Sequence, residues 1–495
     1  MADKAGDEPQ YHSLSLAYQT YLRHDQKEQN HWDGVCRSFR QYATFAMAQW
    51  ANHQNRFQAL PDEQQKVLPK ALRIDTPEYQ MRATQFKEAA IRNQFCLDCI
   101  LRHAGMPHSQ QPLNSGGGDG DPSDAAVVSD SQLSKTSSVL KSLARDWSSE
   151  GKPERDMAYG PLIDQLKKYV PLPTGGDVGK KSPPRICVPG AGAFVNCCLR
   201  VKLFCLSFII VISLTLRPYK HFLLYREGVG RLAFDITALG YSVQGNDFSL
   251  FMLLASDFML NGGVATPENP IMISPWLLES RNVHSPTDPL RIAKVPDVDP
   301  YTVLSERVNA DGSQAENMPE FSMAAGEFAA IYSTEREQNQ WDSVVCSFFL
   351  DTAPSIVEYI QILHDMLKPG GTVISFGPLL FHWSGPAMRP DDKTMKDYHE
   401  RYSYLDVRYL NSVDMCWEDV REIFINVGFE MVEEKTGVHS LYTADRRSMM
   451  NMSYRCVSFV ARKKVKLPRI GSTRMSVDGV SATESGGGNS SLSSH

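Results

Sequence analysis

The 495-residue sequence lacks the features that would place it in several special classes of protein. Its 51 lysines and arginines are outnumbered by 57 acidic residues, so the net charge of −6 gives no sign of a nucleic-acid-binding face. The ten cysteines are scattered, which favours a reduced cytosolic chain over a disulfide framework. The polar N-terminus has no apolar core of the kind that a secretory signal needs. We therefore expect a cytoplasmic protein, with the nucleus as a second location.

A hydrophobic run long enough to cross a membrane is also missing. The apolar stretch at 203–216 has 14 residues and then meets Arg217 and Pro218. A transmembrane helix needs about 20 apolar residues. The length therefore favours a buried or interfacial segment over a membrane anchor.

Clusters of potential metal ligands are scarce. Cys96 and Cys99 form a lone C-x-x-C pair, whereas a zinc site of this type needs a second pair at a similar spacing. We interpret the two cysteines as small apolar residues at i and i+3 of a helix. No metal site is expected.

The composition divides the chain into four parts. Residues 11–105 have apolar residues at i, i+3 and i+4, which predicts an all-helical N-terminal region. Residues 106–136 are rich in Ser, Gly, Asp and Pro, which predicts a disordered linker or a long surface insertion. Residues 138–464 form the third part, and the Ser- and Gly-rich residues 466–495 predict a disordered tail.

The third part predicts an α/β fold. Apolar runs recur along it, among them RICVP, YSVQG and SVVCSFFL, and amphipathic helical segments separate them. The unbroken apolar character of SVVCSFFL is typical of a strand that is buried on both faces. Strands that alternate with helices predict a mostly parallel, doubly wound, Rossmann-like sheet.

A glycine pair follows the first of these predicted strands. Gly190 and Gly192 lie in VPGAG, at the strand-to-helix turn where parallel sheets usually bind ligands. Glycines let the backbone approach a ligand closely, and the following helix N-terminus favours anionic groups. Alone, the pair fits a structural turn equally well.

Spacing to an acidic residue supports a ligand-binding loop. Dinucleotide-type sites place an acid at the end of the second strand, about 20 residues after the glycines. Asp247 follows Gly192 by 55 residues, but by 19 once the 36-residue segment 193–228 is set aside. Gly190, Gly192 and Gly230 then form one G-x-G-x-G loop.

The segment 193–228 therefore has two interpretations. Its composition differs from both flanks and suggests sequence foreign to the catalytic fold, such as a retained intron. Alternatively, it is a genuine insertion whose ends lie close together and leave the loop intact.

Ordered blocks over residues 11–464 together resemble the carnosine N-methyltransferases. They include ARDW, VPGAG, FSMAAGEF, FFLDTA, LKPGGTVISFGPLLFHW and SMMNMSYRC. This resemblance implies a class I S-adenosylmethionine (SAM) methyltransferase with an extra helical N-terminal region. It implies methyl transfer to an imidazole nitrogen of carnosine (β-alanyl-histidine), which gives anserine, with related histidine dipeptides as further candidates.

The resemblance also implies contacts to SAM. An arginine fork would bind its carboxylate, the glycine loop would line its methionine end, and acids after two strands would lie near its ribose and adenine. The residues at these positions are Arg145, then Gly190, Gly192 and Gly230, then Asp247 (where the family often has Glu), and Glu327 and Phe328.

Three further residues match the substrate side of the family. Asp351 ends a buried strand and His382 follows the next one, so both should face the crevice above the sheet. Asp351 would hold either the imidazole N–H or the amine of the substrate. His382 and Tyr454 would supply further hydrogen bonds, and we expect Asp351 and His382 to take part in catalysis.

The implied chemistry needs neither a metal nor a strong base, because imidazole is neutral above a pKa of about 6.5. Two other functions stay open: an inactive or regulatory product whose SAM loop is disrupted, and a nicotinamide oxidoreductase. The oxidoreductase is disfavoured because LKPGG before a strand is typical of SAM methyltransferases. A homodimer is compatible with the sequence.

Overall fold

The computed structural model describes most of the chain between residues 26 and 465. The described ranges are 26–106, 128–173, 182–191, 228–305, 318–405, 407–442 and 445–465. All of them except Val465 belong to one unit, Met1–Lys464. Part of the predicted linker, nearly all of the segment 193–228 and the whole predicted tail lie outside the described residues.

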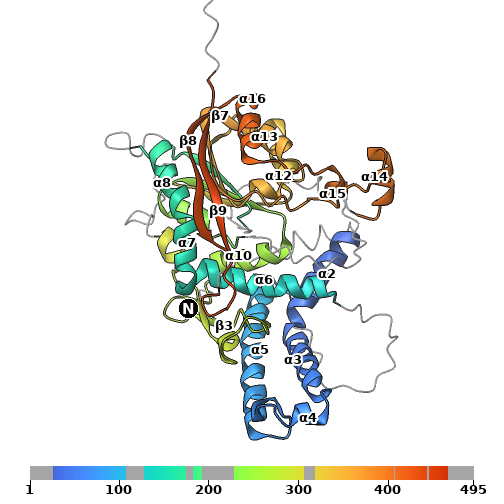
Figure 1. Cartoon of the computed structure of the whole chain (residues 1–495). Helices are drawn as coiled ribbons and strands as arrows, with labels where there is room; N and C mark the ends of the chain where they lie inside the picture. Colours follow the sequence, from blue (N-terminus) through green and yellow to red (C-terminus); the bar gives the residue numbers. More distant parts are fainter. Residues whose placement is uncertain are drawn as a thin grey trace, which may run out of the picture. The chain divides into compact units, whose positions relative to one another are not determined.

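A seven-stranded sheet has the order β5-β2-β1-β6-β7-β9-β8 (Figure 1). Its first five strands are parallel, and β9 pairs antiparallel with both β7 and β8. The predicted mostly parallel sheet is therefore confirmed. The strands are β1 (Arg185–Pro189), β2 (Ser242–Asp247), β5 (Phe321–Ala325), β6 (Trp341–Ser347), β7 (Leu367–Gly377), β8 (Phe429–Leu441) and β9 (Ser453–Lys463).

Helices cover both faces of this sheet, as the doubly wound prediction requires. The side chains of β1 alternate between two cores: Ile186 and Val188 belong to one, and Cys187 belongs to the other. The first core includes α7 (Lys152–Ala158), α8 (Gly160–Tyr169) and α9 (Arg231–Ala238). The second includes α12 (Phe328–Tyr332), α13 (Ile356–Met366) and α16 (Trp417–Val427). Figure 1 shows α7 and α8 on the opposite side of the sheet from these three helices.

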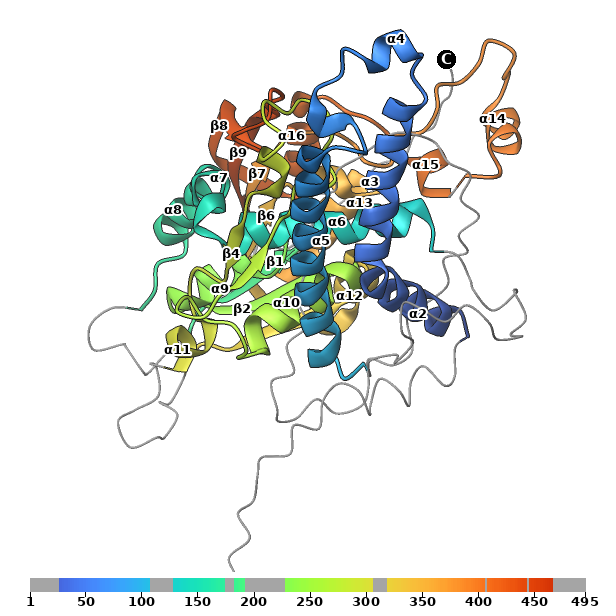
Figure 2. The ribbon, with the colours of Figure 1, turned by 90° about the horizontal axis from the view of Figure 1, so that it is seen from below.

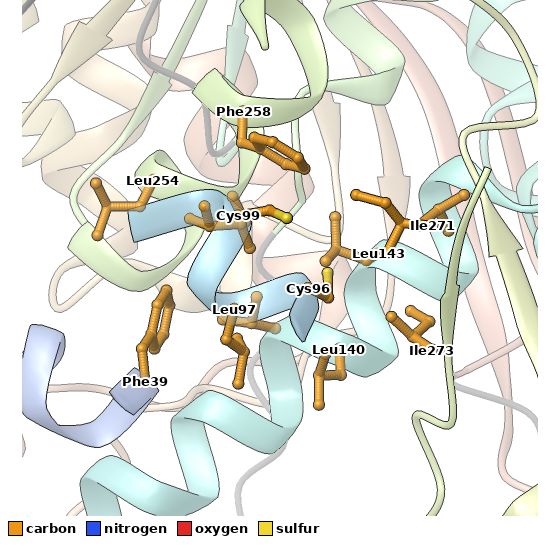
Figure 3. Packing of buried hydrophobic residues seen from close by; sticks show 14 of the residues in the cluster. Phe39, Cys96, Leu97, Cys99, Leu140, Leu143, Leu254, Phe258, Ile271 and Ile273 are labelled. Atoms are coloured by element: carbon orange, nitrogen blue, oxygen red, sulfur yellow. The ribbon is translucent and has the colours of Figure 1, made fainter. Parts of the chain in front are cut away.

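The N-terminal helices share a third core with elements of the α/β part. The N-terminal helices are α2 (Gln26–Arg40), α3 (Tyr42–Gln58) and α5 (Pro77–His103). The elements that share their core are α6 (Asp130–Trp147), α10 (Leu250–Asn261), β3 (Ile271–Ile273) and β4 (Ala293–Val295). Helices α3 and α5 run side by side (Figures 1 and 2). Figure 3 shows Cys96 and Cys99 of α5 packed against Leu143 of α6 and Phe258 of α10. The cysteine pair is therefore part of a helical core, as expected.

The linker expected over 106–136 is shorter than the sequence interpretation allowed. Helix α6 begins at Asp130, and Ser129 and Gln132 form a reciprocal capping box at its start. Leu133 and Thr136 of this first part of the helix are buried. A Ser-x-x-Gln pair is a helix-start signal that was readable in the sequence, and it outweighs the polar composition around it.

The glycine loop after β1 is interrupted in sequence but joined in space. The chain leaves the described region at Ala191 and returns at Gly228. The Gly228 N–H donates to the Gly190 carbonyl at 3.2 Å, and the Gly230 N–H donates to the Ala191 carbonyl at 2.5 Å. If residues 193–227 were absent, these two bonds would link residues i and i+3, and i and i+4, which are ordinary turn bonds.

No helix in the described ranges is both long enough and apolar enough to span a bilayer. The apolar stretch 203–216 lies outside those ranges. Nor do the described residues contain a group of three or more His, Cys, Asp or Glu side chains arranged to hold a metal ion.

A chain that lacks residues 193–227 should fold with the same sheet, because the hydrogen bonds that close the loop lie outside the deleted residues. We expect its melting temperature to stay within a few degrees of that of the full chain, and its solubility and SAM affinity to be equal or higher. Thermal unfolding and a SAM titration of both chains test this. A deleted chain that fails to fold would show that the segment belongs to the catalytic fold.

Candidate active site

The candidate site lies at the carboxyl ends of the parallel strands. The order of the strands reverses at β1, with β2 and β5 on one side and β6 and β7 on the other. Open α/β sheets bind ligands at such a switch point. Gly190, after β1, and Phe349, after β6, face each other there, because a β-carbon on Gly190 would lie 3.5 Å from the Phe349 ring.

Two glycines of the loop need backbone conformations that other residues rarely adopt. Gly190 has φ +75°, and Gly230, which caps α9, has φ +80°. Both values lie in the left-handed region, where a side chain is strained. Gly192, the third predicted member of the loop, lies outside the described residues.

The ends of β2 and β5 are held together beside this loop. The Asp247 side chain is buried, and its Oδ1 accepts the Ser249 N–H at 2.7 Å. The Gly326 N–H donates to the Asp247 carbonyl at 2.8 Å, and the Asn246 amide donates to the Gly326 carbonyl at 2.9 Å. The predicted ribose acid therefore lies next to the turn that carries Glu327.

Glu327 and Phe328 have different environments. Glu327 is exposed and precedes α12. The Phe328 ring is buried, and its centroid lies 5.1 Å from the Phe349 ring and 4.9 Å from the Tyr359 ring. Phe328 thus packs into the core, and its ring exposes little surface for contact with an adenine.

Arg145 lies at the end of α6 and reaches the glycine loop through its neighbour. Its Nε and Nη2 atoms donate to the two Asp146 carboxylate oxygens at 2.7 and 2.8 Å. Asp146 Oδ2 also accepts the Val229 N–H at 3.0 Å. Arg145 further lines a cavity of about 230 Å³ whose walls include Trp276 and Arg291.

Asp351 and His382 meet at the ends of β6 and β7. The Asp351 Oδ2 accepts the Leu380 N–H at 3.0 Å, and the His382 Nε2 lies 3.9 Å from the same oxygen. The His382 N–H donates to the Asp351 carbonyl at 2.9 Å. Both side chains are buried. The Asp351 Oδ1 is buried too and has no hydrogen-bond partner among the described residues.

Tyr454 approaches the same pair from β9. Its ring makes edge contacts with Phe348 (centroids 6.2 Å apart) and Tyr442 (5.1 Å). Phe348 directly follows β6 and has φ +52°, an uncommon conformation for a bulky residue. Burial and then the nearby Asp351 charge raise the pKa of Tyr454, so its hydroxyl stays protonated at neutral pH.

Burial shifts the pKa values of Asp351 and His382 in opposite directions. Loss of solvent raises the pKa of Asp351 from 3.8 to about 6 and lowers that of His382 from 6.5 to about 4. At pH 7 the pair is therefore one carboxylate and one neutral imidazole. A buried carboxylate whose charged form is disfavoured by burial, and which has one oxygen without a hydrogen-bond partner among the described residues, is typical of a functional site.

The predicted residues thus form two groups at one edge of the sheet. Gly190, Gly230 and Asp247 lie around the ends of β1 and β2, with Arg145 joined to them through Asp146. Asp351, His382 and Tyr454 gather beyond β6. The sequence analysis missed Asp146, although it directly follows Arg145, because its contact with Val229 joins residues 83 positions apart.

Replacement of Asp351 by Asn should stabilise the protein at alkaline pH. The pKa of Asp351 is higher in the folded protein than in the unfolded chain. Above about pH 6 the charged carboxylate therefore lowers the free energy of unfolding, and this loss disappears at low pH, where the carboxyl is protonated in both states. A shift of about two pKa units corresponds to about 3 kcal/mol as an upper bound. We expect D351N to melt several degrees above the wild type at pH 8, with the difference shrinking towards pH 4. A difference that does not change with pH would contradict the assigned pKa.

The chain is similar to known proteins over most of its length. A family model described as carnosine N-methyltransferase matches residues 122–205 and 222–465. A carnosine N-methyltransferase of Rattus norvegicus is 30% identical over 441 residues, which cover 88% of this chain and 86% of the relative. The Drosophila melanogaster carnosine N-methyltransferase unmet is 28% identical over 461 residues, covering 90% and 82%.

Solved structures resemble the chain only weakly. A SAM-dependent methyltransferase of Methanosarcina mazei has a TM-score of 0.26 and 11% identity, covering 60% of this chain and 100% of its own. An N-methyltransferase of Haemonchus contortus that acts on phosphoethanolamine has a TM-score of 0.27 and 13% identity, covering 64% and 57%. These scores carry no argument about activity. The match to the family model over both halves of the α/β part, together with the full-length relatives, shows that this chain belongs to the carnosine N-methyltransferase family.

Proposed function

We propose that the protein transfers the methyl group of SAM to an imidazole nitrogen of carnosine, with Asp351 as the acceptor for the other ring nitrogen. The observation that carries the role of Asp351 is its buried Oδ1, which has no partner among the described residues. A buried acceptor without a donor costs about 1–3 kcal/mol, so a ligand N–H that reaches it would recover that energy.

The side of the site near β1 and β2 suits SAM. The loop at Gly190 and Gly230 brings backbone without side chains to the strand ends. Asp247 offers a carboxylate to ribose hydroxyls, and the Arg145 guanidinium lies beside a cavity that can admit a carboxylate. SAM, when bound, supplies an electrophilic methyl group on a sulfonium.

The residues beyond β6 would then orient the nucleophile. An imidazole N–H donated to Asp351 fixes the tautomer, so the lone pair of the other nitrogen points away from the carboxylate. His382, neutral at pH 7, adds no positive charge beside a ring that becomes cationic during transfer. The Asp351 carboxylate attracts that ring more strongly as its positive charge develops, which lowers the barrier.

The two other functions considered for the sequence receive less support. A disrupted SAM loop would separate Gly190 from Gly230, whereas the bonds from Gly228 and Gly230 hold the two limbs together. Membership of a methyltransferase family disfavours a nicotinamide oxidoreductase. A cytoplasmic or nuclear location and a homodimer stay predictions of the sequence. Purified protein incubated with SAM and carnosine, with mass spectrometry of the dipeptide, tests the proposed reaction directly.

Loss of the Asp351 charge should remove catalysis and spare cofactor binding. We expect D351N to lower kcat/KM for carnosine at least about 100-fold, which is about 2.7 kcal/mol of transition-state stabilisation, with SAM affinity changed less than about threefold. Asp365→Asn is a control, because that carboxylate is 63% exposed and lies in the last turn of α13, whose Asp365 carbonyl accepts the Asn339 N–H just before β6 begins. Loss of SAM binding in D351N would move Asp351 to a cofactor or folding role.

Loss of the Asp247 carboxylate should instead lower the affinity for SAM. We expect Asp247→Ala to weaken SAM binding by about 1–3 kcal/mol, because the ribose hydroxyls lose a buried acceptor. Asp247→Glu keeps the carboxylate and should retain most of the affinity. Isothermal titration calorimetry measures both. An unaltered affinity in the alanine variant would show that Asp247 only shapes the turn through Ser249.

A further inference from the structure

The last turn of α6 holds one limb of the glycine loop from both sides. Val229 lies between Gly228 and Gly230, and its N–H donates to the Asp146 Oδ2 at 3.0 Å. Its carbonyl accepts the Trp147 indole N–H at 2.7 Å. Two consecutive residues of α6 therefore bind both polar backbone groups of a single loop residue, which fixes the orientation of the peptides on each side of it.

The Asp146 carboxylate is fully buried and fully paired. Besides Val229, it accepts Arg145 Nε and Nη2 and the Tyr159 hydroxyl, the last at 3.0 Å on Oδ1. Burial acts to raise the pKa of Asp146, but the Arg145 fork and the Val229 N–H hold it below its usual range. Asp146 is thus a permanent anion that orients the Arg145 guanidinium and the loop backbone at once.

An outer layer of charges supports the same turn. The Arg155 Nη1 donates to the Arg145 carbonyl at 2.6 Å, and the Arg231 Nη1 donates to the Asp146 carbonyl at 2.9 Å. Asp297 joins the two arginines, at 2.5 Å from Arg155 and 2.6 Å from Arg231. The turn that carries Arg145 is therefore tied both to α7 and to the first residue of α9.

A buried ion pair is weak evidence for stability, because desolvation of the two charges offsets much of their attraction. A role in stability alone does not explain why the anion also binds the backbone of the loop. We infer that Asp146 is a positioning residue for SAM: it presents Arg145 and the Val229 peptide to the same end of the cofactor. This inference rests on the proposed function.

Replacement of Asp146 should therefore weaken SAM binding and leave carnosine binding nearly unchanged. Asp146→Asn keeps the shape of the side chain but removes its charge, and it cannot accept all four hydrogen bonds. We expect the Kd for SAM to rise at least about tenfold, while KM for carnosine at saturating SAM stays within about twofold of the wild-type value. Replacement of a purely structural residue would instead lower the fraction of folded protein, and with it the binding stoichiometry and kcat per total protein, and would leave the Kd for SAM of the folded molecules unchanged.

Asp235→Asn is the matched control. Asp235 is also an acid paired with an arginine, since its Oδ1 accepts Arg231 Nε at 2.8 Å, but among the described residues its side chain makes no hydrogen bond to Val229 or to the loop glycines. Its SAM affinity and kinetics should match those of the wild type. The Kd is measured by calorimetry, and thermal unfolding of each variant reports how much protein is folded.

The outcomes separate this inference from the proposed function. If the wild type neither binds SAM nor methylates carnosine, the proposed function fails. If the wild type is active and folded D146N binds SAM as tightly as D235N does, the inference is overturned. Should D146N not fold, Trp147→Phe replaces it, because it keeps an aromatic ring and removes the indole bond to the Val229 carbonyl. The buried Trp147 ring also contacts Arg231 and Phe234, so thermal unfolding of this variant is measured alongside its SAM affinity. Weaker SAM binding in that variant supports the inference, and unchanged binding overturns it.

Discussion

The site depends on one short set of backbone hydrogen bonds beyond the carboxyl end of β1. Gly190 and Ala191 accept bonds from Gly228 and Gly230, so two limbs that are far apart in sequence form one loop. Since β1 lies between β2 and β6, at the point where the strand order reverses, this loop lies where open α/β sheets bind ligands. Without these bonds, Asp247 would still end β2 and Asp351 would still lie in the turn after β6, but the loop between them would not be closed.

Two buried carboxylates of the site, Asp146 and Asp351, have different hydrogen-bonding environments and therefore suit different roles. Asp146 accepts four hydrogen bonds, and its pKa is lowered. Asp351 accepts one from Leu380 and keeps an oxygen without a partner among the described residues, and its pKa is raised to about 6. The paired anion is suited to hold other groups in place. The under-paired anion is suited to bind a donor that arrives with the substrate.

Much of this arrangement was predictable from local sequence. Asp247 could be proposed from its spacing to the glycines, and the resemblance to the carnosine N-methyltransferases implied Asp351 and His382. Both follow apolar strands, and the ends of such strands are where parallel sheets carry function. The linker was wrongly expected to continue to residue 136, although the capping residues of α6, Ser129 and Gln132, were present in the sequence. The contact between Asp146 and Val229 could not be predicted, because it joins residues 83 positions apart across an interrupted loop. Local patterns contain no information about such a pairing.

The segment that interrupts the glycine loop lowers the free energy of unfolding less than its length suggests. The entropy of closing a loop grows only with the logarithm of its length, so each doubling costs about 0.6 kcal/mol. Here the two ends are already fixed, by backbone bonds to each other and by Asp146 and Trp147 on Val229. Between its two matched parts the family model omits residues 206–221, so these parts continue into the interruption from both sides. The fold therefore constrains where the intervening chain begins and ends, and it places little constraint on how long that chain is.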